Sequence, residues 1–173
     1  NYSKYSDDSL RVTEKITASD GTFSTRSKYP WNPKVQQGIG GIAKYNLNSE
    51  NSLALKYDFN EEEISDYGAI KRPQFKPYAQ DDFYNTIRQD IALTYDGHLF
   101  KNLYVELTSA YNLFNRRSDN RRFLFEENQY DSLNRISDTT LFNTFFNRLN
   151  ISSRINESWE VTGGLTYTNE AGK

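Results

Sequence analysis

The sequence predicts an all-β chain whose antiparallel strands form part of a transmembrane β-barrel. The first observation is period two: residues 53–59 alternate large apolar residues with Ala54, Lys56 and Asp58, and successive side chains of a strand point to opposite faces. The second is that strand-like segments come in three pairs, joined by short turns and separated by long polar stretches. Short turns at one end of the strands and long loops at the other are typical of membrane barrels.

Six strands are predicted from this alternation, in three pairs: 37–47 with 53–59, 86–95 with 103–113, and 142–155 with 159–167. The connecting turns are expected at residues 48–51, 96–102 and 156–158. Residues 1–34 are expected to be a loop or a ragged hairpin, because Asp20-Gly21 is a turn signal and the proline-containing stretch 29–33 breaks regular structure. Alternation at residues 10–16 hints at one strand there.

Two long polar stretches, residues 60–84 and 115–141, are expected to be outer loops, the second with its own hairpin around residues 131–135. The short turns are expected at the periplasmic rim and the two long stretches outside the cell.

The composition excludes several classes of protein. The 173 residues carry a formal net charge of −2, 15% aromatic residues and no cysteine. A nucleic-acid-binding protein needs a basic stripe, and a disordered chain is poor in aromatic residues. No apolar run approaches the roughly 20 residues of a membrane-spanning helix, whereas a barrel strand needs only about 9–11. Without cysteine there is no disulfide framework and no thiolate chemistry.

The two faces of the predicted strands differ in polarity. One face carries charged residues such as Lys56, Asp58 and Arg154. An Arg or Lys facing lipid costs about 2–4 kcal/mol at the bilayer midplane, so this face is predicted to line the lumen. The other face is predicted to form one lipid-exposed apolar belt: Ile39, Leu53, Leu55, Ile91, Leu93, Val105, Leu107, Leu149, Ile151, Val161 and Leu165.

A soluble antiparallel sandwich is the alternative, because its strands also alternate apolar and polar residues. The predicted strands exceed the usual length of about 5–6 residues. Aromatic residues also gather near the strand ends, as they do in the interfacial girdles of membrane barrels. Burial of the apolar belt against a second sheet would favour the sandwich.

Two motifs lie between the second and third predicted strands: FNEEEI at residues 59–64 and DDFYNTIRQD at residues 81–90, with Gly68, Pro73 and Pro77 between them. This stretch resembles part of the barrel of TonB-dependent outer-membrane receptors, in the subgroup similar to colicin I and vitamin B12 receptors. The resemblance covers residues 37–113. The rest of the chain resembles the family only in the spacing of its predicted strands.

The resemblance implies a barrel of about 22 strands, closed by an N-terminal plug domain. Such receptors take up a scarce nutrient, an iron chelate, haem, cobalamin or a glycan, across the outer membrane of a Gram-negative cell. The chain shows no recognisable plug or TonB box and ends Glu170-Ala171-Gly172-Lys173 rather than in an aromatic residue. Residues 1–173 are therefore expected to be an internal portion of a barrel domain.

The expected partners are outer-membrane lipid, an inner-membrane energising complex that acts through the absent plug, a small-molecule or glycan ligand, and a surface lipoprotein; nucleic acid is not expected. A passive porin-like channel and a soluble or cell-surface glycan-binding β-domain are the alternative functions. A plug domain upstream would separate transporter from channel, and solubility without detergent would favour the third reading.

Ligand contacts are expected from residues of the outer stretches: Tyr67, Arg72, Tyr78, Arg116 and Arg121. The arginines at 116, 117, 121 and 122 either bind an anionic ligand or lipopolysaccharide phosphates, or are simply solvated. The aromatic residues at 29, 31, 67 and 78 either form a ligand platform or pack the loops together. Arg88, Asp90 and Glu106 are predicted to face the lumen or the plug.

No catalytic residue, metal site or cofactor is predicted, and the chain is not expected to be an enzyme. His98, the only histidine, is expected to be an exposed turn residue, and no zinc-binding spacing exists without further His or Cys. Glu61-Glu62-Glu63 and Asp81-Asp82 either bind a hard cation such as Ca²⁺ or are solvated acids. The sequence contains no recognisable nucleophile motif or phosphate loop.

Overall fold

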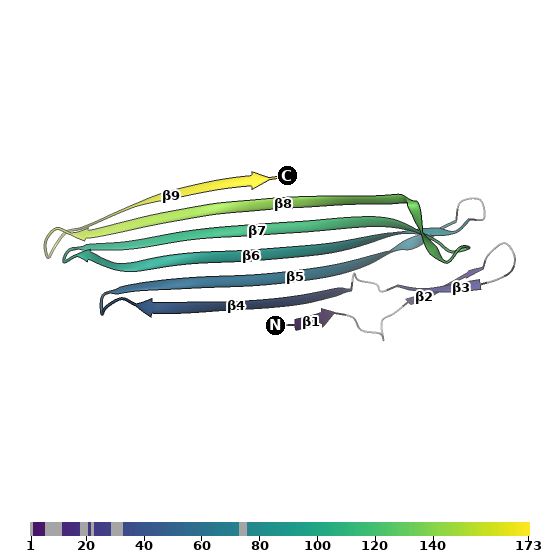
Figure 1. Cartoon of the computed structure of the whole chain (residues 1–173), viewed down its shortest axis with the longest axis horizontal. Helices are drawn as coiled ribbons and strands as arrows, with labels where there is room; N and C mark the ends of the chain where they lie inside the picture. The colour runs from purple at the N-terminus through teal and green to yellow at the C-terminus, as the bar shows by residue number, and fades with distance from the viewer. Residues whose placement is uncertain (1, 6–11, 18–20, 22, 29–32, 73–75) are drawn as a thin grey trace. The chain divides into compact units, whose positions relative to one another are not determined.

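The computed structural model describes residues 2–5, 12–17, 21, 23–28, 33–72 and 76–173, and within them the fold is all-β (Figure 1). The strands are β1 (Tyr2–Tyr5), β2 (Val12–Thr17), β3 (Phe23–Lys28), β4 (Lys34–Asn46), β5 (Asn51–Lys71), β6 (Tyr78–Phe100), β7 (Leu103–Leu124), β8 (Gln129–Arg154) and β9 (Glu160–Gly172). None of the described residues forms a helix that is long and apolar enough to cross a membrane.

The main sheet has seven strands in the order β1-β4-β5-β6-β7-β8-β9, and β2 and β3 form a separate two-stranded sheet. β1 pairs antiparallel with β4, and β8 pairs antiparallel with β9. From β4 onward, sequence neighbours are sheet neighbours, as expected for successive hairpins. In the described part of the chain, β1 and β9 are the end strands, so this part of the sheet does not close into a barrel.

The six predicted strands are confirmed as β4 to β9, but the middle four are much longer than predicted. β5, β6, β7 and β8 contain 21, 23, 22 and 26 residues. The irregular backbone expected for residues 60–84 and 115–141 is therefore wrong for most of both stretches. β5 continues to Lys71, and the turn between β7 and β8 is only residues 125–128, where Asn128 has a φ of 50°. The hairpin expected around residues 131–135 is likewise wrong, because these residues lie within β8.

The polar stretches form strands because their charged side chains have partners on neighbouring strands. Lys34 Nζ pairs with Glu62 at 3.2 Å, and Asn120 donates a hydrogen bond to Asp82 at 2.6 Å. Both faces of such a strand carry polar residues, so the apolar alternation that reveals a strand in the sequence is missing. In these stretches the pattern of polar and turn residues fits a strand as well as it fits a loop.

The N-terminal region contains the hairpin of β2 and β3, which pair from Val12 with Lys28 to Thr17 with Phe23. Gly21, with a φ of 84°, lies in the connection, in a left-handed conformation that glycine adopts without strain. This agrees with the expected hairpin and its turn signal. The proline-containing stretch at residues 29–32, with Tyr29 and Trp31, lies outside the described residues.

The chain divides into two compact units that share the long strands. Unit 1 comprises residues 1–37, 61–86 and 116–139, and unit 2 comprises residues 38–60, 87–115 and 140–173. The buried hydrophobic cluster, Ala79 and Phe125 with Ile70 and Phe123 packed against it, belongs to unit 1. Unit 2 has Val105 as its buried hydrophobic residue among those described.

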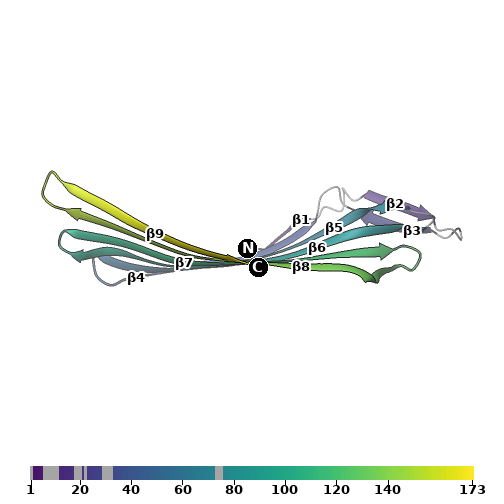
Figure 2. The ribbon, with the colours of Figure 1, turned by 90° about the horizontal axis from the view of Figure 1, so that it is seen from above.

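In unit 2 the register of β8 and β9 brings the predicted apolar faces of the two strands together. The two strands run side by side as one hairpin (Figure 2), with Leu149 opposite Leu165 and Ile151 opposite Gly163. Pairs on the other face include Arg148 with Thr166, Ser152 with Thr162, and Arg154 with Glu160. The predicted faces therefore coincide, although Asn147 and Ser153 lie on the apolar face and Phe146 lies on the polar face.

Most of the predicted apolar belt is exposed in unit 2. Ile39, Leu55, Ile91, Leu93, Leu107, Ile151, Val161 and Leu165 are between 37% and 71% exposed. Leu53 and Leu149 are half-buried. The expected exposure of Val105 is wrong, because this residue is only 6% exposed.

Candidate functional site in unit 1

The most enclosed polar group of unit 1 is the Asp81 carboxylate on β6, which is fully buried. Its Oδ1 pairs with Arg26 of β3 and accepts a hydrogen bond of 3.1 Å from the Gly68 backbone N–H. Its Oδ2 accepts a hydrogen bond of 3.0 Å from the Tyr130 hydroxyl. A buried carboxylate is tolerated only when it is paired and hydrogen-bonded, and here both oxygens have partners.

An aromatic cluster surrounds the guanidinium of Arg26. Its Cζ lies 5.5 Å from the ring centroid of Tyr67, 5.6 Å from that of Phe123 and 5.4 Å from that of Phe125. Cation–π contacts of this kind gain strength when the cation is removed from water, and the Arg26 side chain is only 10% exposed. Arg26 thereby links β3 to the rest of unit 1.

Tyr130 connects this cluster to the neighbouring strands. Its ring packs edge-to-face against Phe83, with centroids 6.1 Å apart, and against Phe123, at 5.1 Å. Burial, followed by the negative charge of Asp81, raises the pKa of Tyr130 well above its ordinary value. The hydroxyl therefore keeps its proton at neutral pH and remains a donor to Asp81.

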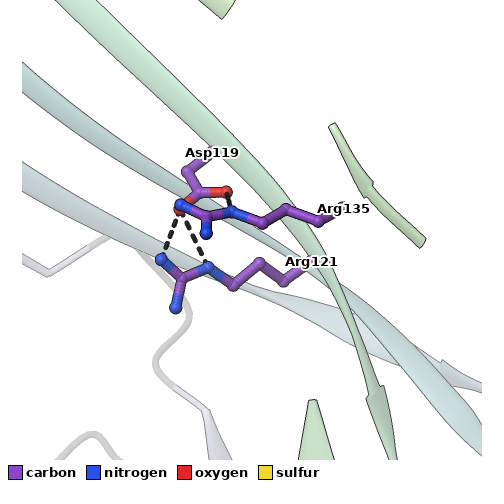
Figure 3. Close-up of polar contacts among 3 residues, drawn as sticks. All are labelled: Asp119, Arg121 and Arg135. Carbon is purple, nitrogen blue, oxygen red and sulfur yellow. Dashed lines mark hydrogen bonds and ion pairs between the residues drawn. The ribbon is translucent and has the colours of Figure 1, made fainter. Parts of the chain in front are cut away.

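A second carboxylate, Asp119 of β7, is held between two arginines (Figure 3). Arg135 approaches it with two parallel contacts, Nε to Oδ1 at 2.8 Å and Nη2 to Oδ2 at 2.8 Å, while Arg121 bonds Oδ2 through Nε at 2.9 Å and through Nη2. These hydrogen bonds, from Arg121 first and then from Arg135, lower the pKa of Asp119 from 3.8 to about 2. The three residues form a fixed, charged group with a net positive charge.

Beside this group lies an open pocket of about 380 Å³. Four strands line it: β5 with Glu63, Ile64 and Ser65, β6 with Phe83, Tyr84 and Asn85, β7 with Arg117, Asp119 and Arg121, and β8 with Arg135. The pocket thus combines guanidinium groups, carboxylates, the hydroxyls of Ser65 and Tyr84, an amide and two aromatic rings. This set can donate and accept hydrogen bonds in several directions around a small ligand.

Of the residues predicted to contact ligand, the structure brings only Arg121 into the pocket. Tyr67 packs in the aromatic cluster, edge-to-face with Phe83. The Arg122 Cζ atom lies 4.7 Å from the ring centroid of Tyr78, and the Arg116 Cζ atom lies 4.6 Å from that of Tyr84. Arg72 is exposed. Tyr67 and Tyr78, which lie on β5 and β6, thus pack against neighbouring side chains and do not line the pocket.

Sequence reasoning considered Glu63 only as a candidate cation ligand and Arg117 only as one of four arginines, and it missed Phe83, Asp119 and Arg135. One signal was available, because Arg117, Asp119 and Arg121 are spaced by two residues and must share a face if they lie on a strand. The expectation of a loop hid that spacing. Arg135 comes from another strand and could be found only from the pairing of β7 with β8.

The residues predicted to face the lumen or plug all lie in unit 2 and make polar or cation–π contacts there. Asn112 donates to Asp90 at 2.5 Å, and Asn150 donates to Glu106 at 3.0 Å. Arg88 lies 5.3 Å from the Phe114 ring centroid.

Of the acidic residues considered as cation ligands, Glu61, Glu62, Asp81 and Asp82 have protein partners, whereas Glu63 is exposed. Glu61 accepts hydrogen bonds from Gln37 at 2.6 Å and Asn85 at 3.2 Å, which lower its pKa. Within the described ranges, no group of three or more His, Asp or Glu side chains is arranged to hold a metal ion. His98 is exposed as expected, edge-on to Tyr104, but it lies in β6 rather than in the turn.

No protein-family model, curated protein or solved structure matches this chain.

Proposed function

We propose that this chain is a segment of the transmembrane barrel of a TonB-dependent outer-membrane receptor, which takes up a scarce nutrient into a Gram-negative cell. The observation that carries the proposal is the exposed apolar face of unit 2. Leu165 and Ile39 are 70% and 71% exposed, and their sequence neighbours are glycine or threonine. Contiguous exposed apolar surface on a sheet indicates a contact with lipid or protein, because it is unfavourable in water.

The opposite face of unit 2 suits a wet interior. Lys56 pairs with Asp58 at 2.7 Å, and both side chains remain well exposed. Arg154 stands opposite Glu160 across the β8–β9 pair. Charged groups that keep this much exposure need water or a polar partner, as in the lumen of a large barrel.

The strand lengths also support a membrane barrel with tall outer hairpins. A membrane-spanning strand needs about 9–11 residues, and β5 to β8, with 21 to 26 residues, are each about twice that length or more. In the proposed arrangement, unit 2 contains the spanning residues, while the hairpins of unit 1 extend outside the cell. A sheet with open edges is not viable in lipid, so the proposal includes further strands beside β1 and β9, in a barrel of about 22.

A soluble sandwich is less well supported. Its two sheets would bury their apolar faces against each other, yet the apolar residues of β9 are all exposed among the residues described. The porin-like channel and the energised receptor share the same barrel features. The receptor is preferred because of the resemblance at residues 59–64 and 81–90.

The test uses single cysteines introduced into the full-length protein in its membrane, at two adjacent positions of β9. Leu165→Cys lies on the apolar face and Thr166→Cys on the polar face, opposite Leu149 and Arg148 of β8 respectively. Both positions are exposed in this structure, so accessibility to water alone should distinguish them. We expect a charged maleimide to label Thr166→Cys and to leave Leu165→Cys unlabelled.

Equal labelling of both cysteines by the aqueous reagent would refute the membrane-spanning assignment. Ligand uptake measured with and without the inner-membrane energising complex then separates a receptor from a passive channel. Uptake that persists without the complex would favour the channel.

A further inference from the structure

The pocket of unit 1 contains two charged side chains whose charges are not used within the described part of the structure. Arg117 and Glu63 line the pocket and are exposed, and neither has an ion pair there. The other charges of the pocket, on Asp119, Arg121 and Arg135, are committed to one another. The triad of Asp119, Arg121 and Arg135 is therefore a fixed part of the pocket lining. Arg117 and Glu63 are the groups free to bind a ligand.

The charges of the pocket select the kind of ligand. Three guanidinium groups stand against two carboxylates, which leaves one net positive charge. A ligand with one anionic group fits this balance, since Arg can bind a carboxylate or phosphate through two parallel hydrogen bonds. A chelate with several negative charges would meet Glu63 and Asp119, and a neutral ligand would leave Arg117 without a counter-charge.

The remaining lining residues suit a ligand rich in hydroxyl groups. Glu63 supplies acceptors, and Ser65 and Asn85 supply small groups that both donate and accept hydrogen bonds. Phe83 provides an apolar surface and is held in place by edge-to-face contacts with Tyr67 and Tyr130. Arg121 is also fixed, because its guanidinium lies 5.4 Å from the Phe83 centroid while it bonds Asp119.

We propose that this pocket binds an anionic sugar. Arg117 pairs with the carboxylate or phosphate of the sugar, Glu63 accepts hydrogen bonds from its hydroxyl groups, and Phe83 packs against its C–H surface. The volume of about 380 Å³ lies at the small end of the range of ligand pockets. The inference names the ligand class of the proposed uptake function and rests on it, because unit 1 must face the exterior to meet such a ligand.

Two sources supply this chemistry: a soluble acidic oligosaccharide and the phosphorylated core sugars of lipopolysaccharide. Three probes distinguish them by isothermal titration calorimetry on the full-length protein in detergent, freed of bound lipopolysaccharide. The probes are oligogalacturonate, its methyl-esterified neutral form, and deacylated lipopolysaccharide core oligosaccharide. We expect an acidic probe to bind and the neutral ester to bind at least tenfold more weakly.

Variants of the pocket test the assigned roles. Arg117→Ala should weaken binding of the acidic probe by about tenfold or more, the usual effect of losing a charged hydrogen bond. Arg117→Lys should retain part of the affinity, and Glu63→Gln should weaken binding less than Arg117→Ala does. Arg154→Ala removes an exposed arginine from unit 2 and is the matched control, with no expected effect.

Preference for oligogalacturonate supports a soluble ligand, and preference for the core oligosaccharide supports a membrane lipid. The proposal is overturned if neither acidic probe binds, if the neutral ester binds equally well, or if Arg117→Ala binds like the wild type. The cysteine labelling of Leu165 and Thr166 is performed on the same preparation in membranes. A normal labelling pattern without sugar binding defeats this inference alone, whereas equal labelling defeats the proposed membrane function.

Discussion

Units 1 and 2 are built from the same long strands but treat their hydrophobic residues in opposite ways. The large hydrophobic residues that are exposed lie mostly in unit 2; the exceptions in the described ranges are Val12, Tyr130, Leu133 and Ile136. Unit 1 instead buries a cluster around Ala79 and Phe125. The same strands thus bury hydrophobic residues in unit 1 and expose them in unit 2.

The polar residues of the two units differ in the same sense. In unit 1, Asp81 and Asp119 are buried or nearly so, and arginines neutralise both. In unit 2, the charged pair Lys56–Asp58 is largely exposed. A small hydrophobic cluster in water gains specificity from satisfied polar partners, whereas a sheet with an external apolar face does not need an internal core.

The largest expected effect comes from removing the buried cation of unit 1. Arg26→Ala leaves the fully buried Asp81 without its counter-charge, and removing one partner of a buried pair costs about 3–5 kcal/mol. Hydrogen exchange on the full-length protein in detergent should show faster exchange in β2, β3 and the neighbouring ends of β5 and β6. Exchange in unit 2 should be unchanged.

A double variant controls for the loss of packing. Arg26→Gln with Asp81→Asn removes both charges and keeps groups that can bond the Gly68 N–H and the Tyr130 hydroxyl, so it should recover most of the protection. If Arg26→Ala exchanges like the wild type, the link assigned to Arg26 is wrong.

The next effect compares one substitution at two equally exposed positions. Leu165 in unit 2 and Ile136 in unit 1 are both 70% exposed. Leu165→Arg should destabilise the protein by about 2–4 kcal/mol if this face meets lipid, whereas Ile136→Arg should change stability by less than about 0.5 kcal/mol. Urea unfolding in lipid vesicles measures both. Similar values for the two variants would remove the distinction between the units.

The smallest effect is the acid sensitivity of the triad in unit 1. The pKa of Asp119 is lowered in the folded protein to about 2, so its ionised form stabilises the fold by about 2 kcal/mol above pH 4. This contribution should disappear as the pH falls from about 4 to about 2, because the carboxylate takes up a proton. Protection factors for amide hydrogen exchange at residues 116–139, which correct for the slower intrinsic exchange in acid, should fall over this range in the wild type.

Asp119→Asn is the control for this titration. It should be less stable at neutral pH and should lack the part of the pH dependence that Asp119 causes, with unit 2 exchange as an internal reference. An unchanged acid profile in Asp119→Asn would show that the two arginines do not depend on this charge.

The sequence by itself determined the strands of unit 2 and their two faces. Alternation is a local property, since residues two apart share a face of any strand, and Leu149, Ile151 and Leu165 therefore fell on one face as expected. Leu53, Leu149 and Val105 are less exposed than the pattern implied, because alternation assigns a face and does not describe what the neighbouring strands place over it.

The tertiary structure alone decided unit 1. Its strands are polar on both faces, so no apolar period marks them, and their stability depends on partners distant in the sequence. Arg26 and Asp81 are 55 positions apart, and the pocket takes residues from four strands. Arg117 and Arg121 were considered from their residue type, but Asp119 and Arg135 became part of a site only through the tertiary structure, in which β7 and β8 are neighbours. Strand register is a long-range property, and it places these charges together where sequence spacing could not.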